Sequence, residues 1–383
     1  MAPRPRPLLL FDPLLLLAAL GLSACSLITL HSATQNLKRG APLYYVERQG
    51  IYIAIGLALA LLFSRVDYSR LREYKYGFYG LIIASNIVVF GMPAILGAHR
   101  WIPLPFFQLQ TSEFGKVMLI AALGSFAVDR SRRLHERRTT ARIMLLALLP
   151  ALLVIAQPDL GTGLVYVTVA LATLFFAGTS WRQLTGLVAL FVVALALVLA
   201  VGPALGVHVL KPYQVQRLTG FLNPSKNPQG ATYNIGQSLI AIGSGGKTGL
   251  GVQGATQTSL GYLPEHQTDF IFAVVGETYG FAGAALVLSL YALLIWRTLR
   301  IVTMSKNLYG TLIAGGVLAM FMFQVFVNVG MTIGIMPITG VPLPLMSYGG
   351  SSVIVTFLAL GLLESIHIQA RLTSAGKGRA VLE

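Results

Sequence analysis

Charged residues are scarce in this sequence of 383 residues, at 11% of the chain, against about 25% in an ordinary soluble domain. Acidic residues are the scarcest, with 13 Asp and Glu beside 28 Lys and Arg. Hydrophobic residues make up 55% of the chain, and the mean hydropathy is +0.73. This composition excludes a disordered chain and a soluble globular enzyme, and it indicates an integral membrane protein.

Cysteine is nearly absent as well. The single Cys25 excludes an intrachain disulfide and a cysteine-based metal cluster. The net charge of +15 would favour a nucleic-acid ligand in a polar protein. On an apolar chain it first indicates a membrane protein, so no nucleic-acid partner is expected. The most basic segment, DRSRRLHERRTTAR at 129–142, lies between two apolar runs. We therefore interpret it as a topology anchor that contacts anionic lipid.

Apolar runs of about 20 residues are what a membrane-spanning helix needs, and the sequence contains ten candidates. They lie at 10–31, 47–64, 76–96, 112–128, 141–157, 160–180, 183–204, 268–299, 307–334 and 349–368. The sequence therefore predicts an all-α integral membrane protein with about ten transmembrane helices, folded as a single polytopic membrane domain over 1–383.

A long connection, residues 205–267, lies between the seventh and eighth runs. Connections beyond about 12–15 residues are usually functional or disordered. The regular apolar content here favours a folded segment with a short amphipathic helix at 233–242. Basic residues indicate the orientation, because 19 of the 28 lie on the side of the termini. The positive-inside rule then places both termini in the cytoplasm and 205–267 outside.

Acidic side chains near the outer side are candidates for chemistry, because burial of a charge in lipid is costly. Asp269, where the long loop enters the eighth run, has two interpretations of equal weight: a helix N-cap and a general base at the mouth of a cavity. Asp159 precedes the sixth run and is expected to cap it. Glu277 lies about 12 Å deeper than Asp269 along the helix axis, where packing or ion pairing is favoured over chemistry.

Cations on the outer side are few, and together with the acidic side chains they make up a candidate site. Glu113 and Lys116 stand three residues apart and can form an ion pair or hold a substrate head group. Singly, the other cations are solvated loop residues, but together with a basic carboxylate they suit a phosphate-bearing substrate. These cations are Arg100, Lys211, Arg217, Lys226 and Lys247.

The segment AIGSGGKT at 241–248 is one residue short of a P-loop, because Ala241 occupies the first glycine position. No strand clearly precedes it, and it lies on the outer side where ATP is scarce. Nucleotide binding is therefore disfavoured. The amides of Gly245 and Gly246, together with Lys247, could still contact a diphosphate.

The segment GIMPITGVPLPLMSYGGS at 334–351 cannot form a regular helix, with three prolines and four glycines in eighteen residues. Non-helical backbone at membrane depth has to be buried in protein or line a cavity. We expect this segment, which contains Ser347, to form a cavity wall near Asp269. Gln324 and Asn328 on the preceding run are interpreted as interhelical hydrogen-bonding residues.

Seven blocks in order along the chain resemble the SEDS proteins, the shape, elongation, division and sporulation family of bacterial cell-wall synthesis. The blocks are GAHRWI (97–102), QTSEFGK (110–116), QPDLGTG (157–163), RLTGFLNPSKNPQG (217–230), YNIGQSLIAIGSGG (233–246), LPEHQTDFIFAVVGE (263–277) and GIMPITGVPLPLMSYGGSS (334–352). The form PITGVPLP is more similar to the family's elongation members than to its division members. Three positions depart from the family pattern: Thr111, Gly115 and Thr278.

The resemblance implies a ten-helix peptidoglycan glycosyltransferase that acts on lipid II, with a class B penicillin-binding transpeptidase as partner. The family's essential acid matches Asp269, its supporting acid matches Asp159, and its conserved pair matches Glu113 and Lys116. In the implied reaction, Asp269 accepts the proton of the acceptor's GlcNAc 4-hydroxyl as that oxygen attacks C1 of the donor's MurNAc with inversion. Polyprenyl diphosphate leaves, and nearby cations stabilise the developing charge.

We therefore predict one catalytic residue, Asp269, and a substrate-binding set around it. The predicted substrate-binding residues are Glu113, Lys116, Asp159, Arg100, Arg217, Lys247, Glu277 and Ser347. No metal ligands are predicted, and a divalent cation such as Mg²⁺ at the diphosphate is left open as the one candidate cofactor. The expected partners are the transpeptidase, lipid II, polyprenyl diphosphate and membrane lipids. Two alternatives remain: a lipid II flippase and an inert scaffold for the transpeptidase.

Overall fold

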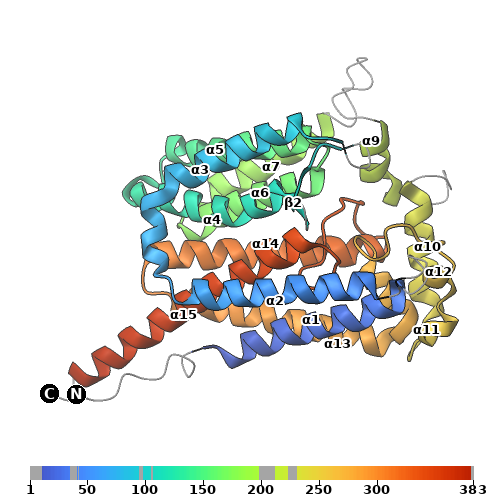
Figure 1. The fold of residues 1–383 in the computed structure, drawn as a ribbon. Helices are drawn as coiled ribbons and strands as arrows, with labels where there is room; N and C mark the ends of the chain where they lie inside the picture. The colour runs from blue at the N-terminus through green and yellow to red at the C-terminus, as the bar shows by residue number, and fades with distance from the viewer. Residues whose placement is uncertain are drawn as a thin grey trace.

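The computed structural model describes residues 11–34, 41, 43–94, 98–104, 107–197, 212–222 and 231–380. Ten helices in this part of the chain coincide with the ten apolar runs and lie side by side in one bundle (Figure 1). They are α1 (Pro13–Thr34), α2 (Tyr44–Ser64), α3 (Lys75–Val88), α4 (Thr111–Asp129), α5 (Arg137–Ala156), α6 (Leu160–Phe176), α7 (Trp181–Ala196), α13 (Ile271–Met304), α14 (Leu308–Thr332) and α15 (Gly350–Ala380). The predicted all-α fold is confirmed.

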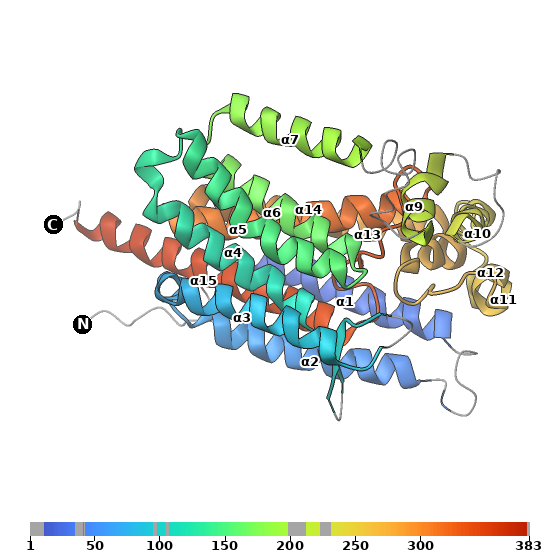
Figure 2. The ribbon, with the colours of Figure 1, turned by 90° about the horizontal axis from the view of Figure 1, so that it is seen from above.

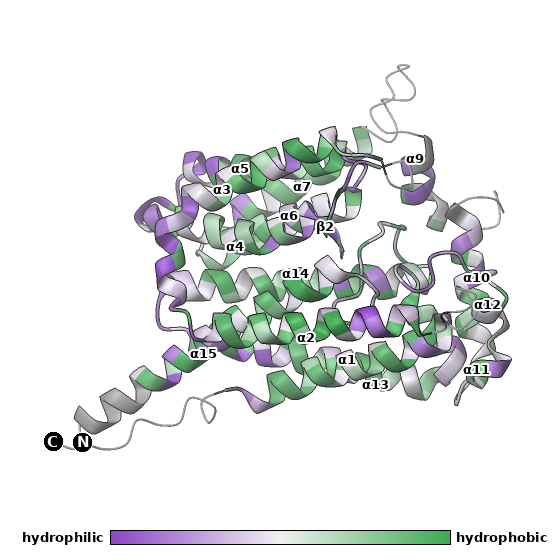
Figure 3. Cartoon of the chain, in the orientation of Figure 1, coloured by the Kyte–Doolittle hydropathy of each residue, from purple (hydrophilic) through white to green (hydrophobic). Residues whose placement is uncertain are grey.

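Seven helices among the described residues are long and apolar enough to cross a membrane, judged by length and composition. These are α1, α2, α4, α5, α13, α14 and α15. Two more, α6 and α7, are shorter apolar helices, and a 3₁₀ turn at Val89–Gly91 extends α3. Hydrophobic residues cover the lengths of the helices, whereas hydrophilic residues gather toward their ends (Figure 3). The chain is therefore a multi-pass membrane protein.

Several helices begin or end a few residues away from the predicted boundaries, and three of these differences have a local reason. The third run was expected to reach residue 96, but α3 and its 3₁₀ extension end at Gly91, where the chain becomes extended before Pro93. Helix α6 ends at Phe176 because Gly178 adopts a left-handed conformation with φ of 85°. Helix α15 continues to Ala380, well beyond 368, because helix formation does not require apolar residues. The predicted end of the seventh run lies outside the described residues.

The bundle divides into two groups of helices (Figure 1). Helices α3–α7 form one group, and α1, α2, α13 and α15 form the other. The largely buried helix α14 lies between them and packs on α4, α6 and α13. Within the second group α2 and α15 approach closely, since a Cβ atom at Gly361 would lie 2.7 Å from the Ala60 carbonyl oxygen. Helix α7 lies at the periphery (Figure 2).

The two ends of the bundle differ, and we call them the terminal end and the loop end. Helix α1 begins and α15 ends at the terminal end (Figure 1). The long connection folds at the loop end as α9 (Pro212–Thr219), a 3₁₀ turn (Gly220–Leu222), α10 (Ala231–Ser244), α11 (Gly251–Gly254) and α12 (Thr256–Ser259). Helix α10 confirms the helix predicted at 233–242, and Ile235, Ser238 and Ala241 lie buried along one side of it.

A small antiparallel hairpin, which the sequence analysis did not predict, also lies at the loop end. Its strands are β1 (Trp101–Pro103) and β2 (Gln108–Gln110), with Trp101 opposite Gln110. The hairpin connects α3 to α4. It therefore places Arg100, just before β1, and Glu113, just after β2, at the same end of the bundle as the long connection.

The glycine-rich segment that resembles a P-loop fills a break in α13. Gly280 there has φ of 64° and ψ of −158°. The freed amide of Phe281 donates to the Gly246 carbonyl at 2.9 Å. A Cβ atom at Gly245 would lie only 1.9 Å from the Gly276 carbonyl oxygen. Glycine is required for this backbone-to-backbone contact, so the segment has a packing role.

Candidate active site

Asp269 lies in the turn immediately before α13, at the loop end. It is half-buried, and the N-cap position of α13 belongs to Phe270, so the capping alternative for Asp269 is wrong. Burial raises the pKa of the Asp269 carboxyl to about 6. The positive charge of Arg217 and, more weakly, of Arg100 opposes this increase, and the negative charge of Glu265 adds to it. Asp269 is thus a carboxylate suited to proton transfer near neutral pH.

Two buried side chains hold the backbone around Asp269. Asn328 Nδ2, on α14, donates to the Asp269 carbonyl at 2.9 Å and to the Val341 carbonyl at 2.8 Å. Ser347 Oγ donates to the Thr268 carbonyl at 2.6 Å. Among the described residues, every hydrogen bond of Asp269 is made by its backbone, which leaves the carboxylate oxygens available for a substrate.

Gln49, which the sequence analysis did not single out, supports this arrangement from α2. The side chain is fully buried, and its Nε2 donates to the Ser347 carbonyl at 3.1 Å. Its Oε1 accepts the Gly349 amide at 3.3 Å. The next amide in the segment, that of Tyr348, donates to the Gln267 carbonyl at 2.9 Å. The non-helical segment 334–349 therefore connects α2 to the turn that carries Asp269, and the prediction that it lies near Asp269 is confirmed.

Arg217 faces Asp269 across Gly340. A Cβ atom at Gly340 would lie 3.4 Å from Asp269 Oδ2 and 3.8 Å from Arg217 Nη1, so both groups lie within 4 Å of one point. Gly340 has φ of 72°, a conformation that favours glycine. The Arg217 carbonyl also accepts the Ile338 amide at 3.2 Å, which ties α9 to the segment 334–349. The structure thus brings the predicted base and one predicted cation together.

A cleft opens beside Arg217, between α9, the start of α6 and the segment 334–349. It has about 270 Å³ of unfilled space, including its open side. Its lining residues are Pro158, Leu160, Gln214, Arg217, Leu218, Ile338 and Thr339. The cleft is mostly apolar with a cation at one position, as expected for a site that accepts an amphiphilic anion.

Asp159 caps α6, as the sequence analysis expected. Its Oδ1 accepts the Thr162 amide at 3.2 Å. Its Oδ2 accepts hydrogen bonds from Gln110 Nε2 at 3.0 Å and from Ser112 Oγ at 3.2 Å. These three donors hold the end of the hairpin against the start of α6, so Asp159 shapes the wall of the site, and its predicted contact with substrate stays a prediction.

Arg100 is bound to the connection between α5 and α6. Its Nε donates to the Gln157 carbonyl at 3.0 Å, and its Nη2 donates to the Pro158 carbonyl. Pro158 also lines the cleft beside Arg217. The guanidinium group is therefore fixed next to the cleft, where its charge acts on Asp269.

Glu113 and Lys116 form the predicted ion pair, with 2.7 Å between Glu113 Oε1 and Lys116 Nζ. Both side chains are buried, at 1% and 2% exposure. The other oxygen of Glu113, Oε2, has no hydrogen-bond partner among the described residues. Protein covers the pair, so its predicted contact with a substrate head group stays a prediction.

The carboxylate of Glu277 is used within the protein, and its predicted contact with substrate stays a prediction. Its Oε1 accepts the Gln257 amide at 2.7 Å, and its Oε2 accepts the Thr258 amide at 3.0 Å and Thr258 Oγ1 at 2.5 Å. The side chain is fully buried. Glu277 therefore anchors α12 to α13, which agrees with the packing role favoured by its depth.

The structure shows the contacts of Ser347 and the position of the Lys247 backbone. Ser347 is buried, and its hydroxyl is occupied by the Thr268 carbonyl and the Leu343 amide, so it supports the Asp269 turn, and its predicted contact with substrate stays a prediction. The backbone of Lys247 packs at Gly280, about 16 Å along the axis of α13 from Asp269, so the structure does not bring Lys247 to Asp269. The predicted cations Lys211 and Lys226 lie outside the described residues.

A resident metal site is not found in the part of the chain that the structure describes. No group of three or more His, Cys, Asp or Glu side chains there has the geometry to hold a metal ion. Asp269 and Asp159 act on each other electrostatically, but they do not form a ligand cluster.

Comparison with known proteins identifies the family of the chain. The model of the FtsW/RodA/SpoVE family of cell cycle proteins matches residues 8–372. The chain belongs to this family. Peptidoglycan glycosyltransferase MrdB of Escherichia coli is 38% identical to it over 95% of both chains. Peptidoglycan glycosyltransferase RodA of Treponema pallidum is 35% identical over 93% of this chain and 97% of its own.

Solved structures of FtsW/RodA/SpoVE-like chains show the same fold. One chain of a peptidoglycan synthase complex that coordinates polymerization and crosslinking matches 94% of this chain and 98% of its own, with 31% identity and a TM-score of 0.78. The rod shape determining protein RodA of Thermus thermophilus matches 93% of this chain and 96% of its own, with 29% identity and a TM-score of 0.66.

In this family member, the site can carry out a nucleophilic displacement, a reaction that needs one base and one group that binds the anionic leaving group. Asp269 supplies a carboxylate with a raised pKa. Arg217 supplies a guanidinium group within reach of the same point. Both groups lie at the loop end, and Asp269 immediately precedes α13. The reacting groups of a membrane-anchored substrate would therefore meet them at the bundle's end.

Proposed function

We propose that this protein is a peptidoglycan glycosyltransferase that polymerises lipid II into glycan strands at the outer face of the cytoplasmic membrane during cell elongation. One observation carries the proposal: the half-buried carboxylate of Asp269, with its pKa near 6, faces the guanidinium group of Arg217 beside a cleft at the loop end. The relatives that carry the name peptidoglycan glycosyltransferase match almost the whole chain.

The reaction forms one bond and breaks another. The 4-hydroxyl oxygen of the acceptor's GlcNAc forms a bond to C1 of the donor's MurNAc, and the bond from C1 to the diphosphate oxygen breaks with its electron pair. Asp269 takes the hydroxyl proton as the oxygen attacks. Because attack and departure occur on opposite faces of C1, the anomeric configuration inverts. General-base assistance of this kind contributes about 10²–10⁴-fold to the rate.

Polyprenyl diphosphate is the leaving group, and its developing charge needs cations. Arg217 is the first candidate, because it lines the cleft and faces Asp269. Arg100, which is hydrogen-bonded to the α5–α6 connection, adds a second positive charge. A divalent cation such as Mg²⁺ at the diphosphate is a further candidate for this role.

The orientation follows from the distribution of basic residues. The exposed arginines of the α4–α5 connection, among them Arg132, Arg133, Arg137 and Arg138, lie at the terminal end. The positive-inside rule places that end, with both termini, in the cytoplasm. The loop end with Asp269 then lies at the outer membrane surface. The polyprenyl tails of the lipid substrates remain in the bilayer, while their sugars reach the cleft.

A class B penicillin-binding transpeptidase is the expected partner. The chain of a peptidoglycan synthase complex that coordinates polymerization and crosslinking shares this fold over 94% of the present chain. A polymerase that delivers glycan strands needs a crosslinking enzyme close by, which supports such a complex for this protein.

Polymerisation of lipid II by the purified protein with its transpeptidase partner tests the proposal. Asp269→Ala should abolish the glycan product while the protein stays folded, with a thermal unfolding temperature no lower than that of the unaltered protein. Glu47→Gln, which alters an exposed acid on the same outer side, is the matched control and should polymerise normally. Normal polymerisation by Asp269→Ala would contradict the proposal and favour the scaffold alternative. Translocation of lipid II in proteoliposomes without any polymerisation would favour the flippase.

A further inference from the structure

A second set of buried ionisable side chains lies at the terminal end, far from Asp269. Asp12 immediately precedes α1, Arg297 lies on α13, and Glu364 and His367 lie on α15. Asp12 is fully buried, Glu364 is 2% exposed and His367 is 4% exposed. Burial of such groups in an apolar bundle is costly, and the proposed glycosyl transfer uses none of them.

Only part of this set is paired. Arg297 Nε and Nη2 donate to Asp12 Oδ2 at 2.8 Å and 2.5 Å, so these two charges neutralise each other. The Asp12 amide donates to Glu364 Oε2 at 3.1 Å. Glu364 Oε1 and both ring nitrogens of His367 have no hydrogen-bond partner among the described residues. The set therefore retains an unpaired carboxylate oxygen and an unpaired imidazole.

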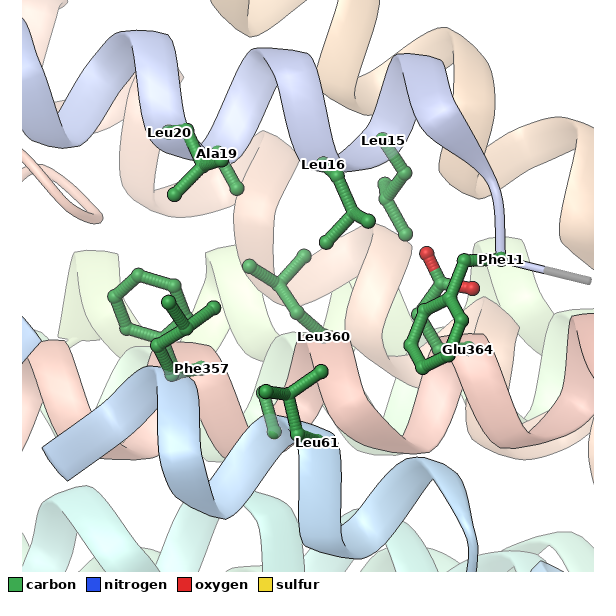
Figure 4. Close-up of a pocket in the computed structure, with 11 residues that line it drawn as sticks. Phe11, Leu15, Leu16, Ala19, Leu20, Leu61, Phe357, Leu360 and Glu364 are labelled. Carbon is green, nitrogen blue, oxygen red and sulfur yellow. The ribbon is translucent and has the colours of Figure 1, made fainter. Parts of the chain in front are cut away.

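Glu364 points into an apolar cleft between α1, α2 and α15 (Figure 4). The cleft has about 370 Å³ of unfilled space, including its open side. Its other lining residues are all apolar: Phe11, Leu15, Leu16, Ala19, Leu20, Leu57, Ala60, Leu61, Phe357 and Leu360. Leu20 is 46% exposed and Leu61 is 38% exposed, so in a membrane the cleft opens to lipid.

The depth of Glu364 matches the region of the lipid head groups. Its neighbour Ser365 donates through Oγ to the Val66 carbonyl at 2.6 Å, just beyond the end of α2. One turn further along, Gln369 Nε2 donates to Asp67 Oδ1 at 3.0 Å. Glu364 thus lies at the level where α2 leaves the apolar layer. The apolar part of the cleft extends from there toward the middle of the membrane.

We propose that this cleft binds a phospholipid whose head group carries a primary ammonium, of which phosphatidylethanolamine is the probe. The ammonium donates to Glu364 Oε1, and an acyl chain lies along Leu16, Leu20 and Leu61. His367 follows Glu364 by three residues and Arg371 follows His367 by four, so all three lie on the same face of α15. Arg371 supplies an exposed guanidinium group for the lipid phosphate, and His367 lies buried between it and Glu364.

Charge complementarity identifies this occupant. Asp12 and Arg297 neutralise each other, and an ammonium group bound at Glu364 would stabilise the ionised form of its carboxyl. An ammonium group both carries the opposite charge and donates hydrogen bonds. A quaternary choline carries the charge but has no N–H to donate, and a glycerol head group leaves the lipid anionic. The site should therefore bind an ethanolamine lipid most tightly, a choline lipid less tightly and a glycerol lipid least tightly.

Lipid retention by the delipidated full-length protein, measured by native mass spectrometry, tests the proposal. Phosphatidylethanolamine, phosphatidylcholine and phosphatidylglycerol with identical acyl chains are added separately. Phosphatidylethanolamine should bind most tightly. Glu364→Gln should weaken it about tenfold, because glutamine keeps an acceptor for the Asp12 amide but loses the charge. Glu136→Gln, which alters an exposed acid at the same end, is the control and should leave the ranking unchanged.

A second variant separates head-group recognition from folding. Leu20→Trp fills the lipid-facing side of the cleft and leaves Glu364 in place, so it should weaken the binding of all three lipids. Equal binding of the three lipids by the unaltered protein, or an unchanged ranking in Glu364→Gln, would overturn the proposal. The proposal would also be overturned if the unaltered protein showed no preference among the lipids but the Arg4→Gln/Arg6→Gln double variant preferred phosphatidylethanolamine. In that case the chain's own arginines would be the occupant of the cleft.

Discussion

The pH dependence of polymerisation tests the role of Asp269 most directly. A general base has to be ionised, and burial raises the pKa of Asp269 to about 6. The value of kcat/KM should therefore rise with pH through 6 and level off above about 7. One unit below the pKa, only about a tenth of the carboxyl groups are ionised, so the rate at pH 5 should be about tenfold below that at pH 7.5.

The same pH profile measured for Arg217→Gln distinguishes the titration of Asp269 from a general effect of pH on the protein. A cation close to a carboxylate lowers its pKa by about 1–3 units, and the half-buried position of Asp269 places the expected effect of Arg217 at the lower end. Loss of that charge should therefore move the midpoint of the profile upward by about one unit. If Arg217 also stabilises the leaving diphosphate, the plateau rate should fall independently of the midpoint.

Initial rates with labelled lipid II between pH 5 and pH 8 provide both quantities. Lys247→Gln is the matched control, because the structure places this exposed cation away from the site; its midpoint and plateau should equal those of the unaltered protein. A profile that is flat between pH 5 and pH 7.5 would refute the assignment of Asp269 as the base. A midpoint that stays at 6 in Arg217→Gln would refute the electrostatic coupling of the two residues.

Three further substitutions test the support of the site. The pKa of Asp269 is raised in the folded protein, so ionisation of its carboxyl opposes folding as the pH rises from about 4 to 6. Asp269→Asn should therefore raise the free energy of unfolding at pH 7 by at most about 3 kcal/mol. This gain should vanish in unfolding experiments below pH 4. Asn328→Leu removes two buried hydrogen bonds, which should cost about 1–3 kcal/mol of stability and lower kcat about tenfold with little change in KM. Glu277→Gln places an amide N–H group opposite the backbone N–H donors of residues 257 and 258, which weakens the attachment of α12 to α13. Hydrogen exchange of the α12 amides should therefore accelerate, whereas that of the α14 amides should not.

The helices could be predicted from the sequence because each depends on local composition. A run of apolar residues identifies a membrane helix wherever it lies, and all ten runs contain one. The errors arose where a single residue ends a helix. Pro93 and Gly178 end α3 and α6 earlier than the apolar runs end. The polar end of α15 carries no hydropathy signal, so its length was missed.

The role of individual cations could not be predicted, because it depends on contacts between remote segments. Arg217 and Lys247 both lie in the long connection, and both are basic. Gly340, more than a hundred residues from Arg217, brings that arginine to Asp269. The break in α13 at Gly280 draws Lys247 away instead. Neither contact can be recognised from the sequence around Arg217 or Lys247.

The polar residues of the apolar helices carried a signal that the sequence analysis used incompletely. Asn328 was interpreted as an interhelical hydrogen-bonding residue, and that is its role, but its partner is the Asp269 backbone. Gln49, on α2, was not considered, although a buried amide in an apolar helix has to find partners. The identity of those partners depends on how α2 packs against the segment 334–349, which no local pattern encodes.

The way Asp269 is held explains how a carboxylate in a confined site keeps its basicity. Hydrogen bonds donated to a carboxylate stabilise the charged form and lower its pKa. Asn328 and Ser347 donate to backbone carbonyls at Asp269 and Thr268, and among the described residues the Asp269 carboxylate accepts no hydrogen bond. Asp159 shows the opposite arrangement, with three donors on its carboxylate. Anchoring through the backbone thus fixes the position of Asp269 without lowering its pKa, so its oxygens remain able to accept a proton, whereas Asp159 is committed to holding the structure.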